Sequence, residues 1–499
     1  MTFCALSSAK GMDIKMEEKQ AFNPFLPEYE YIPDGEPHVF GDRVYVYGSH
    51  DKFGAPMFCV NDYVCWSASV DDLKSWSFEG VIYRKRQDPK NRLGLRLLFA
   101  PDVARGKDGR YYLYYAFDFM GMMGVAVSDR PCGPFQFYGH VCYPEGEIWG
   151  RKKEDAFPFD PGIFVDDDGK VYLYSGFYTP VPSIVTGFRK LKFEGGYMVE
   201  LQEDMKTIKK APIVLFPKKG SGAFQNHEFF EASSMRKING KYYFIYSSRH
   251  NHEICYAVGE KPDGKFEFGG TLVSNGDLFL NGNTNENHAS NYIGNIHGSI
   301  LQLKERYYVF YHRHTNRSSY ARQACAEELV MRADGSFEQA EMTSCGLNGG
   351  PLKGNGRYEA RIACNLWANG GETGRYDCRN PKKRFKKHPY FTQDRKDGDE
   401  RARQYIANMQ NGAMAGFKYF EIKKLSRISV CVRGNAKGKI YVSVLVDEKN
   451  KIAEIPIESK GGKWKWWTAN AVSDMGIKAL YFQFEGDGNL DFLEFELEE

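Results

Sequence analysis

Acidic residues recur along this chain at a fixed position, about ten residues ahead of short aromatic segments. Several carboxyl groups that converge on one site can have pKa values far apart, so that one stays protonated while another is ionised. Such a set can protonate a leaving group and activate a water molecule. The residues at this position are Asp34 and Glu36, Asp102, Asp160 and Glu231, and the fifth copy carries His297 in place of an acid.

The segments that follow these residues predict the elements that position them. Each joins a turn to an alternating run of aromatic and aliphatic residues, as a β-hairpin requires. The five copies are "DRVYVYGS" (42–49), "GRYYLYYA" (109–116), "GKVYLYSG" (169–176), "GKYYFIYSS" (240–248) and "ERYYVFYH" (305–312). Their tyrosines stand about 60 to 70 residues apart, which indicates a repeat architecture.

The repeat predicts an all-β fold that begins with a five-bladed β-propeller, because radial repetition protects the edges of short sheets. A β-sandwich with coincidental hairpins is the alternative. In a propeller the loops that enter the first strand of each blade converge on one face, which is where the acidic residues stand. The repeat ends near residue 335. We expect an N-terminal extension over 1–19, the propeller over 20–340, and a β-sandwich (jelly roll) over 356–499, after the Gly-rich linker "CGLNGGPLKGNG" at 345–356.

Composition excludes several classes of protein. The net charge of +3 over 499 residues indicates neither a nucleic acid nor an acidic membrane as partner. No apolar run approaches the roughly 18 residues that a membrane-spanning helix needs. The 11 cysteines include no CxxC pair, and the first twenty residues lack the apolar centre of a signal peptide. We therefore expect a cytoplasmic protein with reduced thiols.

Two of the repeated segments resemble a known family. "FDPGIFVDDDGKVYLYSG" (159–176) and "FFEASSMRKINGKYYFIYSS" (229–248) are similar to segments of the five-bladed propeller of family 43 glycoside hydrolases. The resemblance implies an inverting glycosidase with an aspartate base, a second aspartate that tunes pKa, and a glutamate acid. It assigns these roles to Asp34, Asp160 and Glu231, respectively.

The sequence departs from the family pattern at the position of the base. The family usually has Asp-Pro at this point, and this chain has "DGEP" at 34–37, so Glu36 is an alternative base. "FAPDV" (99–103) resembles the W-A-P-D motif with phenylalanine in place of tryptophan, which implies a structural or substrate-orienting role for its aspartate. The residues expected to contact the sugar are Asp102, Glu36, His50, Asp51 and Arg322.

The resemblance also implies a central ion, often calcium, beside the histidine of the fifth blade. His297 in "IHGSI" is the candidate for that position, and a hydrogen-bonded buried histidine is the alternative interpretation. No organic cofactor is expected.

The C-terminal region resembles a family 6 carbohydrate-binding module, most clearly at "ARQYIANMQNGAMAGFKYFEI" (402–422). The tryptophans of "GGKWKWWTA" (461–469) could form a stacking platform for sugar rings. Alternation along a strand would expose only some of Trp464, Trp466 and Trp467, so at least one is expected to lie in the core.

The function that these features favour is exo-acting removal of terminal α-L-arabinofuranosyl or β-D-xylosyl residues from plant-type oligosaccharides. The alternatives are a β-D-galactofuranosidase and a non-catalytic, sugar-binding propeller. A structural scaffold ranks last, because it would have no need for acidic residues at the start of successive blades.

Overall fold

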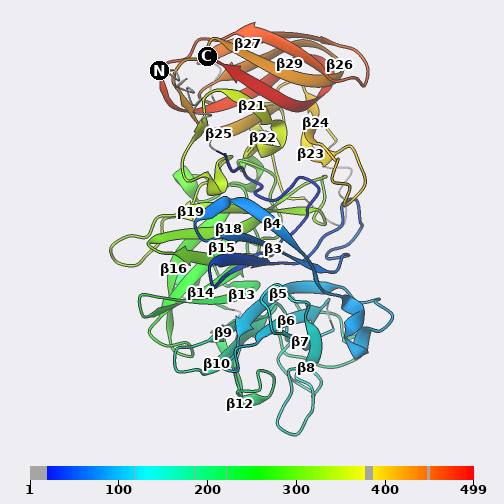
Figure 1. Ribbon diagram of the computed structural model, residues 1–499, viewed down its shortest axis with the longest axis vertical. Coiled ribbons are helices and arrows are strands. Elements are labelled where there is room, and N and C mark those ends of the chain that lie inside the picture. The colour runs from blue at the N-terminus through cyan, green and yellow to red at the C-terminus, as the bar shows by residue number, and fades with distance from the viewer. Residues whose placement is uncertain are drawn as a thin grey trace, which may run out of the picture.

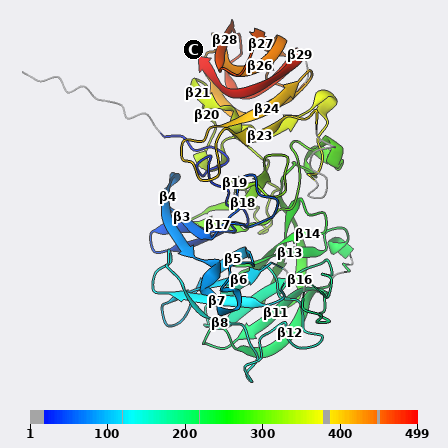
Figure 2. The same ribbon diagram turned by 90° about the vertical axis from the view of Figure 1, so that its right-hand side faces the viewer.

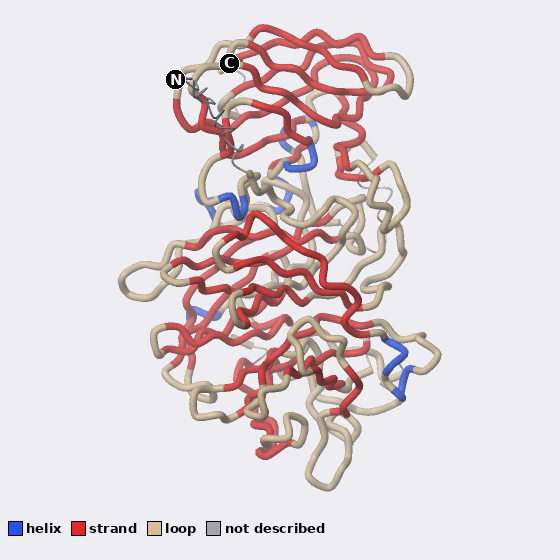
Figure 3. The backbone as a smooth tube through the Cα atoms, viewed as in Figure 1, coloured by secondary structure: helices blue, strands red, loops and turns tan. Residues whose placement is uncertain are grey.

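The computed structural model describes residues 19–118, 120–184, 186–217, 219–220, 222–376, 386–446 and 450–499. Residues 1–18 of the predicted N-terminal extension lie outside these ranges. The described chain is built from strands and single-turn 3-10 helices (Figures 1 and 3). The helices are η1 (Lys85–Gln87), η2 (Pro89–Asn91), η3 (Gly222–Phe224), η4 (Leu280–Gly282), η5 (Glu286–His288), η6 (Gly346–Asn348), η7 (Ala360–Ile362) and η8 (Asn369–Gly371). None of the helices in the described part is long and apolar enough to cross a bilayer.

Five antiparallel sheets follow one another along the first two thirds of the chain. The first holds β1 (Glu36–Phe40), β2 (Arg43–Tyr47), β3 (Tyr63–Ser69) and β4 (Asp72–Tyr83). The second holds β5 (Leu98–Arg105), β6 (Tyr111–Phe117), β7 (Met123–Ser128) and β8 (Gln136–His140). The third holds β9 (Gly162–Val165), β10 (Val171–Gly176), β11 (Gly195–Leu201) and β12 (Ile208–Pro217). The fourth holds β13 (Phe229–Ile238), β14 (Lys241–Ser248), β15 (Glu253–Gly259) and β16 (Phe266–Ser274), and the fifth holds β17 (Ile300–Leu303), β18 (Arg306–His314) and β19 (Arg322–Leu329). The predicted five-bladed propeller is confirmed.

The aromatic repeat is explained by the packing between blades. Side chains alternate across a strand, so the second strand of each blade buries one set against the preceding blade and the other against the next. On β6, Tyr112 and Tyr114 pack in the core shared with the third blade, whereas Leu113 and Tyr115 pack in the core shared with the first. A strand buried on both faces needs large apolar residues at every position, and the repeated motif supplies them.

The first strands of neighbouring blades contact one another around the axis of the propeller. The ring is closed by the segment before β1, because Phe25 donates its backbone N–H to the carbonyl of Ala324 on β19, at 3.3 Å. The side-chain amide of Asn23 also donates to the carbonyl of Ala326 at 2.9 Å. These contacts tie the two ends of the propeller together, so that the entry loops of all five blades are held around one axis.

The C-terminal part forms a ten-stranded sheet system, which confirms the predicted all-β domain after the propeller (Figure 1, top). Its strands are β20 (Leu352–Lys353), β21 (Gly356–Glu359), β22 (Asn365–Trp367), β23 (Tyr390–Gln393), β24 (Gln404–Gln410), β25 (Met414–Ile422), β26 (Arg427–Ser443), β27 (Lys451–Ser459), β28 (Lys465–Asn470) and β29 (Gly476–Glu498). One large apolar core joins them, with Phe417, Phe482, Phe492 and Phe495 at its centre.

The C-terminal domain sits directly on the propeller, as the view in Figure 2 also shows. Asn316 donates its backbone N–H to the carbonyl of Phe391 at 2.7 Å, and the guanidinium of Arg313 lies 4.0 Å from the Phe391 ring. The predicted linker is part of this junction: Leu347 in η6 is buried against the first and fifth blades. The two parts therefore share an extensive packed interface.

Candidate active site

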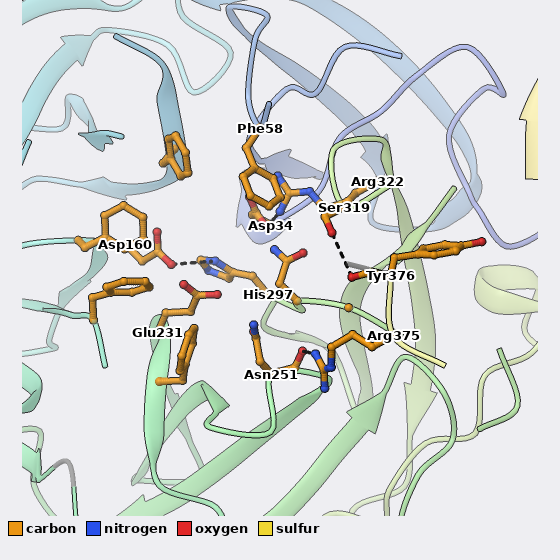
Figure 4. Close-up of a pocket in the computed structure, with 16 residues that line it drawn as sticks. Asp34, Phe58, Asp160, Glu231, Asn251, His297, Ser319, Arg322, Arg375 and Tyr376 are labelled. Carbon is orange, nitrogen blue, oxygen red and sulfur yellow. Dashed lines mark hydrogen bonds and ion pairs between the residues drawn. The ribbon is translucent and has the colours of Figure 1, made fainter. Parts of the chain in front are cut away.

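A cavity of about 760 Å³ opens where the entry loops of the blades converge (Figure 4). One end is aromatic and the other is polar. Three acids face the cavity: Asp34, Asp160 and Glu231. The rest of its wall is made by Phe58, Phe99, Phe159, Phe177, Phe230, Asn251, Gly294, Asn295, His297, Ser319, Arg322, Arg375 and Tyr376. The structure thus brings together residues that stand about 200 positions apart in the sequence, on blades one, three and four.

The backbone at the three acids shares one unusual feature. Asp34, Asp160 and Ala232 (the residue after Glu231) all have positive φ, at 60°, 47° and 68°. This left-handed region costs a non-glycine residue roughly 1–2 kcal/mol and is concentrated at functional sites. Strand β13 also has register shifts on either side of Glu231, and such bulges re-aim a side chain. The local conformation turns the acids toward the cavity at the expense of regular pairing.

Asp34 is held beside a fixed positive charge. Arg322 Nη1 donates to Asp34 Oδ1 at 3.0 Å, while Arg322 Nε and Nη2 donate to the two carboxylate oxygens of Asp51 at 2.8 and 3.0 Å. The Phe58 ring packs 4.8 Å from the same guanidinium. Arg322 lines the cavity, whereas Asp51 does not. Asp51 is fully buried behind Arg322 and orients it.

Glu231 and Asp160 form an acid pair with shifted pKa values. Burial raises the pKa of Glu231 well above its usual range, and the Asp160 carboxyl adds to the rise. Burial also raises the pKa of Asp160, to about 7. The pair therefore keeps a proton on Glu231 near neutral pH, which is the state that a general acid needs.

His297 lies between Asp160 and Glu36. Its Nδ1 is 3.6 Å from Asp160 Oδ2, and its Nε2 is 3.7 Å from Glu36 Oε1. Burial by itself would lower the pKa of His297, but Glu36, Asp160 and Asp34 together raise it to about 9. The imidazole is thus a cation at neutral pH, and its charge balances part of the acidic cluster.

The residues around His297 fit the predicted calcium ion poorly. His297 Nε2 and Glu36 Oε1 are buried atoms without a hydrogen-bond partner in the described residues, as a ligand site would require. However, Arg236 Nη2 donates to Glu36 Oε2 at 2.7 Å and neutralises the same carboxylate. A hard cation prefers several oxygen ligands with net negative charge, whereas here the guanidinium of Arg236 already bonds to the one glutamate.

The side chains of a neighbouring cluster are also already paired with other protein groups. Glu36, His38 and Asp102 lie close enough together to hold a metal ion, yet His38 Nε2 already contacts Asp102 Oδ1 at 2.6 Å. Asp102 Oδ2 accepts from the backbone N–H of Ile163 at 2.8 Å. Asp102 therefore joins the first three blades at the axis, and the cavity wall does not include it.

Four residues predicted to contact the sugar thus lie away from the cavity wall: Asp102, Glu36, His50 and Asp51. The reason is that position at a blade entry does not fix how deep along the axis a side chain lies. Glu36 stands two residues beyond Asp34, at the start of β1, where it is fully buried and paired with Arg236. His50 bonds instead to the carbonyl of Asp62 at 2.8 Å.

Several residues of the wall were not identified from the sequence. The aromatic end is made by phenylalanines from blades one to four, and although Phe99, Phe159 and Phe230 lie in the motifs that resemble the family, none of them was predicted as a site residue. The polar end uses Asn251, Ser319, Arg375 and Tyr376, which come from loops with no repeat pattern. A periodic signal marks strands, so it could not have found residues in irregular connections.

The three tryptophans of the predicted stacking platform face different surroundings. Trp464 lies against Tyr405 with ring centroids 5.4 Å apart, and the Arg433 guanidinium covers its face at 4.3 Å. Trp466 is 40% exposed but carries the Arg357 guanidinium over its ring at 4.7 Å. Trp467 packs against the apolar core. The rings do not form one open platform, and whether this surface binds sugar stays a prediction.

Comparisons with known proteins agree with this geometry. The profile of "Glycosyl hydrolases family 43" matches residues 23–337, which are the five blades. A "Xylosidase/arabinosidase" of Thermoclostridium stercorarium is 45% identical over 96% of this chain and 99% of its own length. A "Xylosidase/arabinosidase 43A" of Humicola insolens is 32% identical over 56% of this chain and 88% of its own.

Solved structures are also similar to this chain. An arabinoxylan arabinofuranohydrolase of Bacillus subtilis in complex with cellotetraose shares 21% identity, with a TM-score of 0.49, over 96% of this chain and 97% of that one. A β-xylosidase/α-arabinofuranosidase from a compost metagenome, in complex with xylotriose and in a calcium-free form, shares 26% identity with a TM-score of 0.49. That alignment covers 65% of this chain and 98% of that one.

Proposed function

Because this chain belongs to glycosyl hydrolases family 43, we propose that it removes terminal α-L-arabinofuranosyl or β-D-xylosyl residues from plant-type oligosaccharides, with inversion. The chain is a glycoside hydrolase. The choice of sugar is supported by the 45% identity with the T. stercorarium xylosidase/arabinosidase, which extends over both domains.

The observation that carries this proposal is the presence of Asp34 and Glu231 in one cavity, on different blades, with Asp160 beside them. Glu231 holds a proton through its raised pKa and donates it to the leaving oxygen. Asp34 takes a proton from the attacking water on the other face of the sugar. The water forms the new bond to the anomeric carbon as the glycosidic bond breaks, which inverts the configuration.

Asp34 is a better base than Glu36 on structural grounds. Asp34 faces the cavity, and its contact with Arg322 leaves the carboxylate open to the pocket side. Glu36 is fully buried and bound to Arg236 and to Ser234, whose hydroxyl donates to Glu36 Oε2 at 2.9 Å. We therefore assign the activation of water to Asp34. No step of this mechanism requires an organic cofactor.

The test is a panel of 4-nitrophenyl glycosides with α-L-arabinofuranosyl, β-D-xylosyl and β-D-galactofuranosyl groups, followed by proton NMR of the first anomer released. We expect cleavage of one or both of the first two, with an inverted first product. Cleavage of the galactofuranoside alone would contradict the choice of sugar, and a retained configuration would contradict the roles of Asp34 and Glu231. Release of none of the three would leave a non-catalytic sugar-binding propeller as the better description.

A further inference from the structure

The wall of the cavity is completed by the C-terminal domain. A segment between β22 and β23 leaves that domain and reaches the propeller, where Arg375 and Tyr376 line the polar end of the cavity (Figure 4, right). We call residues 368–376 the arm. The pocket of the catalytic domain is thus built from two domains, although the family profile ends at residue 337.

The arm is fixed to the loop between the fourth and fifth blades by backbone pairing. Ile293 donates its N–H to the carbonyl of Gly374 at 3.1 Å and accepts from the N–H of Tyr376 at 3.0 Å. The Tyr376 ring stacks on Tyr292 with centroids 4.9 Å apart and planes 14° from parallel. Tyr376 therefore anchors the arm, and Arg375 is the side chain that it presents at the rim.

The guanidinium of Arg375 is fixed by three hydrogen bonds, which do not use all of its N–H groups. Its Nη2 donates to Glu286 Oε1 at 2.9 Å and to the carbonyl of His250 at 2.6 Å, and its Nη1 donates to the carbonyl of Asn251 at 3.0 Å. A guanidinium has five N–H groups, so two of them have no acceptor recorded among the described residues. The side chain is 29% exposed, at the mouth of the cavity.

A second polar group points to a ligand at the same end. Asn251 also lines the cavity, with φ of 54°, and its Oδ1 is a buried atom without a hydrogen-bond partner in the described residues. An unpaired amide oxygen beside two unpaired guanidinium N–H groups offers both an acceptor and donors. Sugar hydroxyls can satisfy both, because each hydroxyl donates one hydrogen bond and accepts two.

We propose that Arg375 is a specificity-determining residue that binds hydroxyls of the saccharide on the leaving-group side of the scissile bond. The inference rests on the proposed function, because it takes Glu231 as the acid. The sugar that is cleaved must lie against the three acids inside the propeller. Arg375 is held by the loop after β14, which belongs to the same blade as Glu231, so it stands on the side to which the protonated oxygen departs.

The experiment compares Arg375→Ala with the wild-type enzyme on two kinds of substrate. Xylotriose and arabinoxylo-oligosaccharides release a sugar as the leaving group, whereas 4-nitrophenyl glycosides release 4-nitrophenol and have no sugar on that side. We expect KM for the oligosaccharides to rise about tenfold and kcat/KM for the aryl glycosides to change less than twofold. Glu286→Gln should give a smaller rise in the same KM, because it loosens the clamp but keeps the guanidinium. Arg375→Lys should recover only part of the loss.

The matched control is Arg427→Ala, since Arg427 is an exposed arginine of the C-terminal domain that pairs with Glu498, away from the cavity. It should leave both KM values unchanged. An equal loss on both kinds of substrate would place Arg375 at the cleaved sugar and overturn the proposal, as would an unchanged KM for the oligosaccharides. Circular dichroism checks that the variants fold.

A binding measurement separates this inference from the proposed function. Xylotriose is titrated by calorimetry into Glu231→Gln with and without Arg375→Ala, so that no turnover is needed. We expect about tenfold weaker binding when the arginine is absent. If the wild-type enzyme cleaves no sugar of the panel, the proposed function fails, and the calorimetric comparison still decides whether Arg375 contacts a saccharide.

Discussion

The axis of the propeller and the core of the C-terminal domain are built in opposite ways. The axis buries charged groups, among them Asp34, Asp160 and His297, and it has left-handed backbone at two of them. The C-terminal core is one apolar cluster, and ion pairs such as Arg427 with Glu498 lie at the surface of that domain, at 53% and 32% exposure. Burial of charge and backbone strain cost stability, whereas apolar burial supplies it.

This difference shows that the propeller axis holds the reactive groups and that the apolar cores stabilise the fold. Reactive groups need desolvation to shift their pKa values, and the surrounding structure must tolerate that cost. The apolar clusters between the blades and the C-terminal core supply the stability that offsets it. The arm departs from this division, because it is a part of the C-terminal domain that lies at the catalytic cavity.

The largest expected effect is on catalysis. Glu231→Gln should lower the rate on unactivated oligosaccharides by about 10²–10⁴-fold and largely spare aryl glycosides with good leaving groups, because such groups need no proton. Steady-state kinetics on both substrates measures it. Glu203→Gln, a control at an exposed position of the third blade, should change neither rate. An equal loss on both substrates would move the acid role to another residue.

A substitution in the C-terminal core should lower stability and leave catalysis unchanged. Phe482 is fully buried, with the rings of Phe417, Phe492 and Phe495 5.5, 5.5 and 4.9 Å away. Phe482→Ala should lower the free energy of unfolding by about 3–5 kcal/mol, through lost burial and the cavity left behind. The melting temperature should fall while kcat/KM of the folded enzyme at 25 °C is unchanged.

Val472→Ala is the matched control, because Val472 is 81% exposed and its truncation should leave the melting temperature as it is. If Phe482→Ala lost activity without losing stability, the division between the two regions would not hold.

A smaller effect is expected on the pH profile. The negative charge of Asp160 adds to the raised pKa of Glu231, so Asp160→Asn should lower that pKa. Glu231 then loses its proton at a lower pH, and the basic limb of kcat/KM moves down by about one pH unit. The profile should be measured with an oligosaccharide, since an aryl substrate bypasses the acid. An unchanged basic limb would leave Asp160 as a residue that binds sugar.

The smallest effect is expected on removal of divalent metal. Because Arg236 already supplies positive charge beside Glu36, dialysis against a chelator should leave activity and melting temperature unchanged. Loss of activity that calcium restores would show instead that the axis holds the predicted ion. Both quantities should be measured on the same dialysed sample.

Much of the fold and part of the site could be predicted from the sequence. The aromatic hairpins gave the five blades, because a strand buried on both faces has a strong local pattern. Asp34, Asp160, Glu231, His297 and Arg322 were all predicted at the site, and all line the cavity. The depth of each residue along the axis could not be predicted. Glu36 and Asp102 occupy the same sequence slot as the acids, yet they bind Arg236 and His38.

By itself the sequence determined the repeat, the two-domain order and the blade on which each acid stands, since these depend on turns and alternation within short segments. Only the tertiary structure decided which charges neutralise one another and which loops meet. Arg375 reaches the cavity from a loop of the second domain, where it is held by Glu286 and by the carbonyls of His250 and Asn251. No local pattern encodes such a meeting, because it depends on how two separately folded sheets dock.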